Sequence, residues 1–199
     1  MANRSYIYII KKDEKTIGLS EAKYDIPLVF KILVSQHTQM VKSRIFEYDD
    51  TIALQGDFKG GIEKLYSFLD NIYLKQIGNT EFIQNKIKKT KEFFESLEGD
   101  YFYLDASEVL EMDGEDIFFE NKKLFERIKN IDKEIDDFYK YVEEKQRLIY
   151  EIQNKLPYKG LFAKGKNEKA ALELKRLNSE IDDLFFMDYW GGPLYYTID

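Results

Sequence analysis

Seven carboxylates and no lysine or arginine lie between Asp105 and Glu120, a composition that suggests calcium or magnesium. A calcium-binding loop with Gly114 at its invariant glycine would need an oxygen ligand five residues earlier. That position is Val109, so the pattern of a calcium loop fails. We therefore predict no metal site and no cofactor.

Residues 160–167, Gly-Leu-Phe-Ala-Lys-Gly-Lys-Asn, match most of a phosphate-binding G-x-x-x-x-G-K-[ST] pattern. Asn167 stands where the magnesium-binding Ser or Thr belongs, and a long predicted helix precedes the motif in place of a strand. We interpret the segment as a loop between two helices. A metal- or nucleotide-dependent enzyme, built on this loop or on the 105–120 acids, is the alternative function.

The same loop combines lysines with apolar side chains and has no acid between Gln153 and Asn167. Such a tip suits contact with an acidic protein, a phosphate backbone or an anionic membrane surface, although apolar tip residues also fold back to cap helices. The residues predicted to contact a partner are Tyr158, Lys159, Leu161, Phe162, Lys164 and Lys166.

Nucleophilic catalysis has little support. The chain has no cysteine and one histidine, His37, which excludes thiolate chemistry and multi-histidine metal sites within one chain. Ser20 follows a predicted strand but precedes Pro27, which is not the strand-turn-helix context of a nucleophile elbow. We predict no catalytic residues.

The fold class predicted for residues 1–112 is α+β, with a small mixed sheet and packed helices. Apolar residues at helical spacing predict a short helix after Pro27 and longer helices beyond Asp57 and Thr80. A C-terminal strand over 190–199 is expected to complete the sheet. β-Branched and aromatic residues predict the other strands at 5–10, 16–19, 44–48, 51–54 and 101–104, the third and fourth forming a hairpin.

A heptad pattern begins at Leu124 and runs to Leu156 at alternating spacings of four and three, with apolar residues at every position of the seam except Lys145. A second apolar stripe follows. Residues 113–189 are therefore predicted to form a protruding, coiled-coil-like antiparallel helical hairpin with its tip loop at 157–167.

The two predicted helices of this hairpin differ in length. At 1.5 Å per residue the first spans roughly 50 Å and the second about 30 Å, so the start of the first seam needs another surface. That surface is either the α+β domain or, as a second choice, a second copy in a homodimer. The seam residues that need a partner are Leu124, Ile128, Ile131 and Ile135.

The chain carries 30 basic and 37 acidic side chains, for a net charge of -7. Nucleic acid is an unfavourable partner for such a chain. No window approaches the ~18 apolar residues of a transmembrane helix, and no signal-peptide pattern opens the sequence. The expected location is the cytoplasm.

Several strings resemble an uncharacterised family of bacterial proteins whose members begin with a similar Met-Ala-Asn-Arg-Ser-Tyr string. They are residues 1–8, 17–21, 24–27, 52–58, 188–190 and 194–196. The resemblance covers the first eighty residues and the last dozen best, and the hairpin looks like a variable insert. The resemblance implies a bacterial, cytosolic setting, and it supplies no activity, cofactor or catalytic residue that could be transferred to this chain.

These observations favour a non-catalytic protein-interaction module that uses the helical hairpin and the acidic surface. A concrete version is an immunity- or antitoxin-type protein whose acidic surface neutralises a basic partner. The specific partner is unidentified. A further alternative is a structural homodimer in which the seam residues of two copies pack against each other.

Overall fold

The computed structural model describes residues 2–74, 80–159, 163–184 and 190–198. Its five-stranded sheet has the order β2-β1-β5-β4-β3, and all neighbouring strands are antiparallel. The α+β class is confirmed. The expectation of a mixed sheet is wrong, because β5 returns between β1 and β4 in the direction opposite to both. The strands are β1 (Arg4–Ile10), β2 (Thr16–Lys23), β3 (Gln39–Val41), β4 (Ala53–Asp57) and β5 (Tyr101–Asp105).

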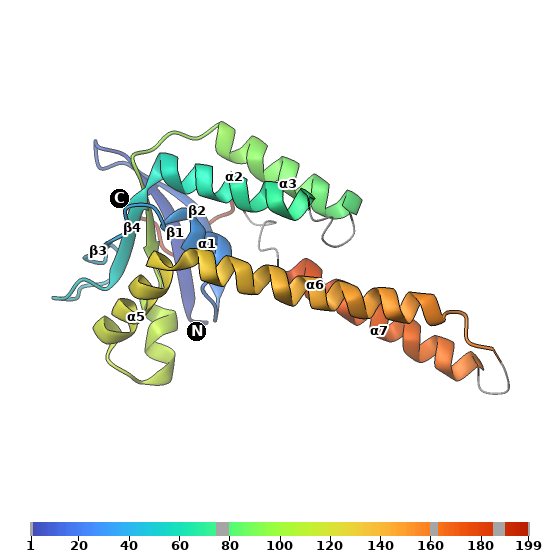
Figure 1. Cartoon of the computed structure of the whole chain (residues 1–199). Helices are drawn as coiled ribbons and strands as arrows, with labels where there is room; N and C mark the ends of the chain where they lie inside the picture. Colours follow the sequence, from blue (N-terminus) through green and yellow to red (C-terminus); the bar gives the residue numbers. More distant parts are fainter. Residues whose placement is uncertain (1, 75–79, 160–162, 185–189, 199) are drawn as a thin grey trace.

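Within the described residues the chain also forms seven α-helices and one short 3-10 helix, η1 (Glu111–Asp113). Helices α1 and α2 lie over one face of the sheet, α3 lies beside α2, and α6 runs away from the sheet alongside α7 (Figure 1). The helices are α1 (Leu28–Leu33), α2 (Phe58–Leu74), α3 (Thr80–Glu95), α4 (Ser107–Leu110), α5 (Ile117–Lys129), α6 (Ile131–Lys155) and α7 (Ala163–Leu184).

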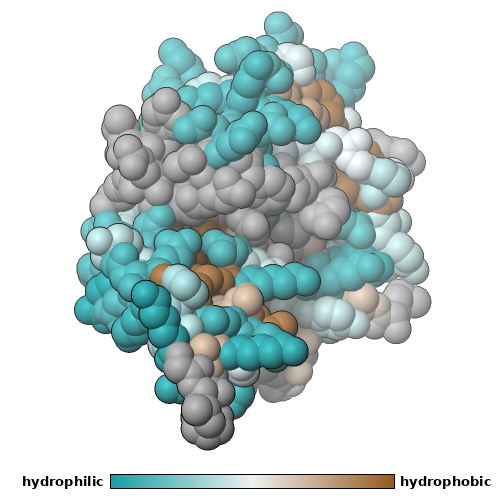
Figure 2. All heavy atoms as spheres, turned by 90° about the vertical axis from the view of Figure 1, so that its right-hand side faces the viewer, coloured by the Kyte–Doolittle hydropathy of each residue, from teal (hydrophilic) through white to brown (hydrophobic). Residues whose placement is uncertain are grey.

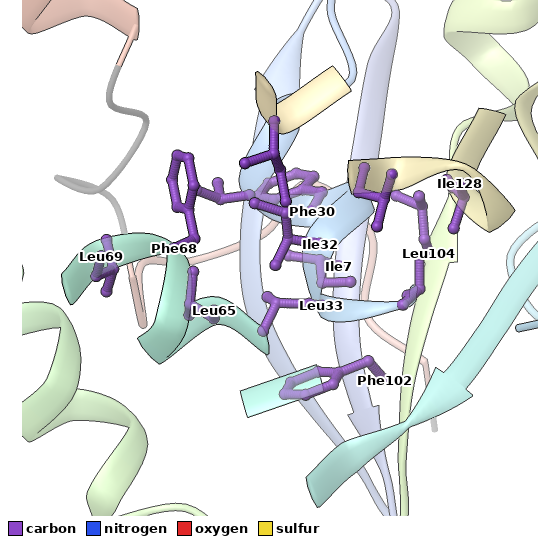
Figure 3. Packing of buried hydrophobic residues seen from close by; sticks show 14 of the residues in the cluster. Ile7, Phe30, Ile32, Leu33, Leu65, Phe68, Leu69, Phe102, Leu104 and Ile128 are labelled. Atoms are coloured by element: carbon purple, nitrogen blue, oxygen red, sulfur yellow. The ribbon is translucent and has the colours of Figure 1, made fainter. Parts of the chain in front are cut away.

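The main core lies between the sheet and its helices. Alternate residues of β1 and β5 point toward the helices, as the period of two in a strand requires. Their apolar side chains meet those of α1, α2 and α5 and exclude water from this side of the sheet. Figure 3 shows Ile7, Phe30, Ile32, Leu33, Leu65, Phe68, Leu69, Phe102, Leu104 and Ile128 in this cluster.

The opposite face of the sheet is covered by irregular chain. Its buried residues, among them Tyr6, Tyr8 and Tyr103, pack against the loop between β3 and β4 and against residues 194–198. No strand forms over 190–198, which corrects the expected C-terminal strand. The segment does return to the sheet, but it lies on the face of the sheet and does not pair with an edge strand. The Tyr8 hydroxyl donates a hydrogen bond to the Tyr196 carbonyl at 2.9 Å.

The hairpin predicted over 44–48 and 51–54 is also wrong. The strand that pairs with β4 is β3, and residues 44–46 and 49–50 form bends. The cause is local, because the Ser43 hydroxyl accepts the backbone N–H groups of Ile45 at 3.1 Å and Phe46 at 2.9 Å. These bonds occupy donors that a strand ladder would need.

The long helix predicted from Leu124 to Leu156 is two helices. Helix α5 ends at Lys129 and α6 begins at Ile131. Between them the Asn130 side chain donates to the Glu126 carbonyl at 2.9 Å, four residues back, which satisfies an acceptor at the end of α5. The apolar spacing continues through this break, so periodicity alone does not reveal it.

Helices α1 and α2 pack so closely that a glycine is needed between them. A Cβ on Gly61 would lie 2.1 Å from the Leu33 carbonyl oxygen and 2.8 Å from the Phe102 ring. We expect Gly61→Ala to lower the free energy of unfolding by roughly 1–3 kcal/mol, measured by urea denaturation. Gly165→Ala is the control, because a Cβ there meets nothing within 4 Å. This variant should be neutral or up to about 1 kcal/mol more stable. Equal stability of both variants would contradict the close approach.

Candidate functional site

The tip of the α6–α7 pair is closed by a side-chain clamp. The Tyr158 N–H donates to the Asn167 side-chain oxygen at 2.8 Å, and the Asn167 amide donates back to the Tyr158 carbonyl at 3.4 Å. Asn167, which breaks the phosphate-loop motif, therefore joins the two ends of the tip. The Lys166 ammonium lies 5.9 Å from the centre of the Tyr158 ring. Leu161 and Phe162 lie outside the described residues.

Five lysines surround this clamp, and all of them are exposed. Along the described ranges, no ion pair joins any of the five to an acid. The end-on view in Figure 2 is dominated by hydrophilic side chains, with hydrophobic ones in smaller areas between them. The tip is thus a positively charged surface on an acidic protein. The five are Lys155, Lys159, Lys164, Lys166 and Lys169.

Helix α7 begins at Ala163, so part of the predicted 157–167 loop is helical. Gly165 and Lys166 lie within the first turn of a helix and do not form a loop that cradles phosphate. The helix that precedes the motif is α6, where a phosphate-binding loop requires a strand. The geometry gives nucleotide binding no support.

The polar interruption of the seam is satisfied within the arm. Lys145 lies in α6 and pairs with Glu180 of α7 at 2.7 Å. The hydrogen bond between them raises the pKa of Lys145 and lowers the pKa of Glu180. Leu177 and Val142 are buried between the helices beside this pair. The pair therefore fixes the register of α6 against α7.

The start of the predicted seam lies in the chain's own core. Leu124, Ile128, Ile131 and Ile135 are at most 7% exposed and pack with the residues that cover the sheet. Nearby, the Tyr139 hydroxyl donates to the Phe68 carbonyl at 3.1 Å. These side chains leave no apolar face for a second copy at this position.

The acids between Asp105 and Glu120 do not converge. Asp105 is fully buried, and its carboxylate accepts hydrogen bonds from the hydroxyl groups of Ser43 and Ser107, each at 2.6 Å. Glu108 accepts from the Tyr6 hydroxyl at 2.8 Å, and Asp116 accepts the N–H of Phe119 at the start of α5. Within the residues open to description, no three such side chains could hold a metal ion.

Other places for catalysis are equally unsupported. Ser20 is buried in β2, whereas His37 is exposed after α1. A charged groove of ≈ 680 Å³ lies between α5 and α6, and within it Arg127 pairs with Glu134 at 3.1 Å and Lys129 with Glu126 at 3.3 Å. We find no helix, among those the structure describes, that is long and apolar enough to cross a membrane.

One surface was missed by sequence reasoning. Phe118 and Phe119 of α5 are exposed beside the acids that were considered only as metal ligands. Tyr48, distant in sequence, donates a hydrogen bond to Glu111 and joins this surface. The sequence signal that could have predicted this surface is a pair of adjacent phenylalanines within a run of acidic residues.

The described residues form an α+β fold in which α6 runs away from the sheet alongside α7 (Figure 1). A family model for a domain of unknown function, DUF7822, matches residues 10–145, more than half of the chain. The chain therefore belongs to this family. No curated protein and no solved structure matches it. The matched range ends within α6, so the tip lies outside it.

We expect Asp105→Asn to destabilise the protein strongly. The carboxylate accepts four hydrogen bonds, including those from the Tyr103 hydroxyl and the Ser107 N–H, both at 3.1 Å. An amide has one acceptor oxygen and turns its NH₂ group toward donors. The loss should be about 2–4 kcal/mol in urea denaturation. Glu115→Gln, at an exposed position, should stay within about 0.5 kcal/mol. Similar values for the two variants would contradict the network.

Alkaline pH should unfold the protein through its buried tyrosines. Burial raises the pKa of Tyr6, Tyr8 and Tyr103 above the usual tyrosine range, with help from nearby carboxylates. Burial also raises the pKa of Tyr139 to about 12. The unfolded chain loses these protons near pH 10, whereas the folded protein keeps them to higher pH. The contribution of these tyrosines to the free energy of unfolding is therefore fully present below about pH 10 and falls as the pH rises above it.

Denaturation curves between pH 8 and pH 11.5 measure this effect. Tyr8→Phe should show a shallower loss of stability above about pH 10, because one suppressed ionisation has been removed. A stability that does not change across this range would contradict the buried hydroxyl groups.

Proposed function

We propose that this protein is a non-catalytic protein-interaction module, and that the tip of a protruding, coiled-coil-like hairpin is its contact site. One observation carries the proposal: five exposed lysines without ion pairs in the described residues gather at the far end of the arm. An immunity- or antitoxin-type protein is the concrete form that fits a small, acidic binding module.

The charge distribution supports an acidic partner for the tip. Between Lys155 and Lys169 there are five lysines and one acid, Glu168, on a chain of net charge -7. Lys164 and Lys166 lie in the first turn of α7, where the helix dipole makes positive charge unfavourable. An acidic surface on a partner would relieve that repulsion. We therefore propose a protein with an acidic face as the partner of the tip.

The packing of the arm supports a role in presenting this tip. Helix α6 has 25 residues, a length of about 37 Å at 1.5 Å per residue. Its first turns are anchored in the core by Ile131 and Ile135, and Lys145 near its middle pairs with Glu180 of α7. An arm fixed at its base places its end clear of the sheet (Figure 1).

A nucleic-acid partner is less favourable than a protein. The phosphate backbone would meet the lysines but would also approach a molecule with excess acid, and repulsion would weaken the complex. Binding to a protein needs only a local match of charge and shape at the tip. Nucleic acid and anionic membranes remain outcomes that the experiment below distinguishes.

Affinity capture from the native host tests the proposal. We expect a stoichiometric protein to co-purify with the tagged parent, and to be lost, by at least about tenfold, when Lys159, Lys164 and Lys166 are changed to glutamate. The matched control changes three exposed lysines elsewhere to glutamate: Lys23, Lys89 and Lys175. Equal capture by both triple variants would contradict the tip as the contact site, as would co-purification of nucleic acid or lipid alone.

A further inference from the structure

A second surface lies at the opposite end of the molecule from the arm tip, where α5 begins (Figure 1). We define residues 47–50 and 111–119 as the acidic corner. Four large apolar side chains in this surface are between 37% and 54% exposed. Chains rarely leave aromatic groups of this size together in water without a use for them. The four are Tyr48, Met112, Phe118 and Phe119.

The two segments of the acidic corner are held together by hydrogen bonds. The Tyr48 hydroxyl donates to the Glu111 carboxylate, and the buried Asn121 amide donates to the Thr51 carbonyl at 3.2 Å. The segment from Tyr48 to Thr51 is therefore fixed at both ends, to η1 and to α5. Asp49 and Asp50 lie between these two points and must share the surface.

The phenylalanines are also fixed in place. Asp116 caps α5 by accepting the Phe119 N–H at 2.9 Å, and Gly114 makes the preceding turn with a φ of +72°. Helix α5 is tied to the core through Leu124 and Ile128. The exposed rings thus stand on a rigid element, so little conformational entropy would be lost when a partner binds.

The two segments of the acidic corner are negatively charged. Residues 47–50 and 111–119 contain seven acids and no lysine or arginine. A cation from outside these segments, the Lys123 ammonium, lies 4.7 Å from the centre of the Phe119 ring and pairs with Glu120 at 2.5 Å. The fold itself therefore shows a cation in contact with this ring, the geometry of a cation–π interaction.

We infer that the acidic corner is a docking surface for a lysine- and arginine-rich segment of a partner protein that carries an apolar anchor. The acids attract and orient the basic side chains, and the anchor covers Met112, Phe118 and Phe119. This site is distinct from the arm tip, which has the opposite charge. Nucleic acid is disfavoured here, because phosphates would face carboxylates.

Fluorescence anisotropy with a labelled peptide tests the inference. The probe is Arg-Lys-Leu-Arg-Phe-Lys-Leu-Arg-Lys, and the control peptide replaces Leu and Phe with Ser at the same charge. We expect the probe to bind at least about fivefold more tightly than the control peptide, and Phe119→Ser to weaken probe binding about tenfold. Asp49→Asn with Asp50→Asn should weaken it as well and reduce its dependence on salt.

Two further variants separate the possible outcomes. Tyr150→Ser removes an exposed aromatic side chain from the arm and should leave probe binding unchanged. The Lys159, Lys164 and Lys166 glutamate variant should also bind the probe normally, so failure at the tip and failure at the corner are distinguishable. Equal binding of both peptides, or normal binding by Phe119→Ser, would overturn the inference.

Sedimentation of the parent protein tests for a different occupant. We expect no self-association that depends on the acidic corner. If the protein associates, and both Phe119→Ser and the tip variant abolish that association, the occupant is the basic tip of a second copy. That result would overturn the inference of a foreign segment.

Discussion

The buried carboxylate of Asp105 is the interaction on which much of this structure depends. It stands at the end of β5, the strand at the centre of the sheet. Its hydrogen bonds reach Ser43 in the loop after β3 and Ser107 at the start of α4. A charge removed from water needs such partners, because an unpaired buried carboxylate is strongly unfavourable. The central strand therefore sets the path of the loop that carries Tyr48 and of the helices that carry Phe119.

From this centre the chain builds a body with two chemically opposite ends. The helices on one face of the sheet bury the apolar seam of α5 and the base of α6, so the arm is attached through the same core that holds the sheet. At one end the arm carries lysines, and at the other the acidic corner carries carboxylates around exposed rings. Both surfaces stand on packed helices, as the proposed binding to partners requires.

The sequence predicted the structure best where the spacing of apolar residues is enough to distinguish a strand from a helix. The strand at 5–10 and the helices after Asp57 and Thr80 follow from apolar spacing, and the structure contains them. The bend at 44–46 does not follow from the residue pattern, because the Ser43 hydroxyl competes for backbone donors that this pattern assigns to a strand. The break at Asn130 was missed because the apolar stripe passes through it unchanged.

The two candidate sites also differ in how far they could be predicted from the sequence. Lysines close together in sequence remain close at a helical tip, so the composition of the loop identified that surface. The acidic corner joins segments more than sixty residues apart through the hydrogen bond from Tyr48 to Glu111. No local sequence pattern predicts a hydrogen bond between such distant residues. The order of the strands, which places β5 between β1 and β4, is likewise set by long-range packing.

The most direct test of the central claim is photo-crosslinking in the native host. A photoreactive residue is placed at Lys159 on the tip or at Lys89 on α3, both of which are exposed. We expect a discrete crosslinked protein from position 159 and none from position 89. No crosslink from position 159, or the same products from both positions, would contradict the claim that the arm tip is where this protein binds its partner.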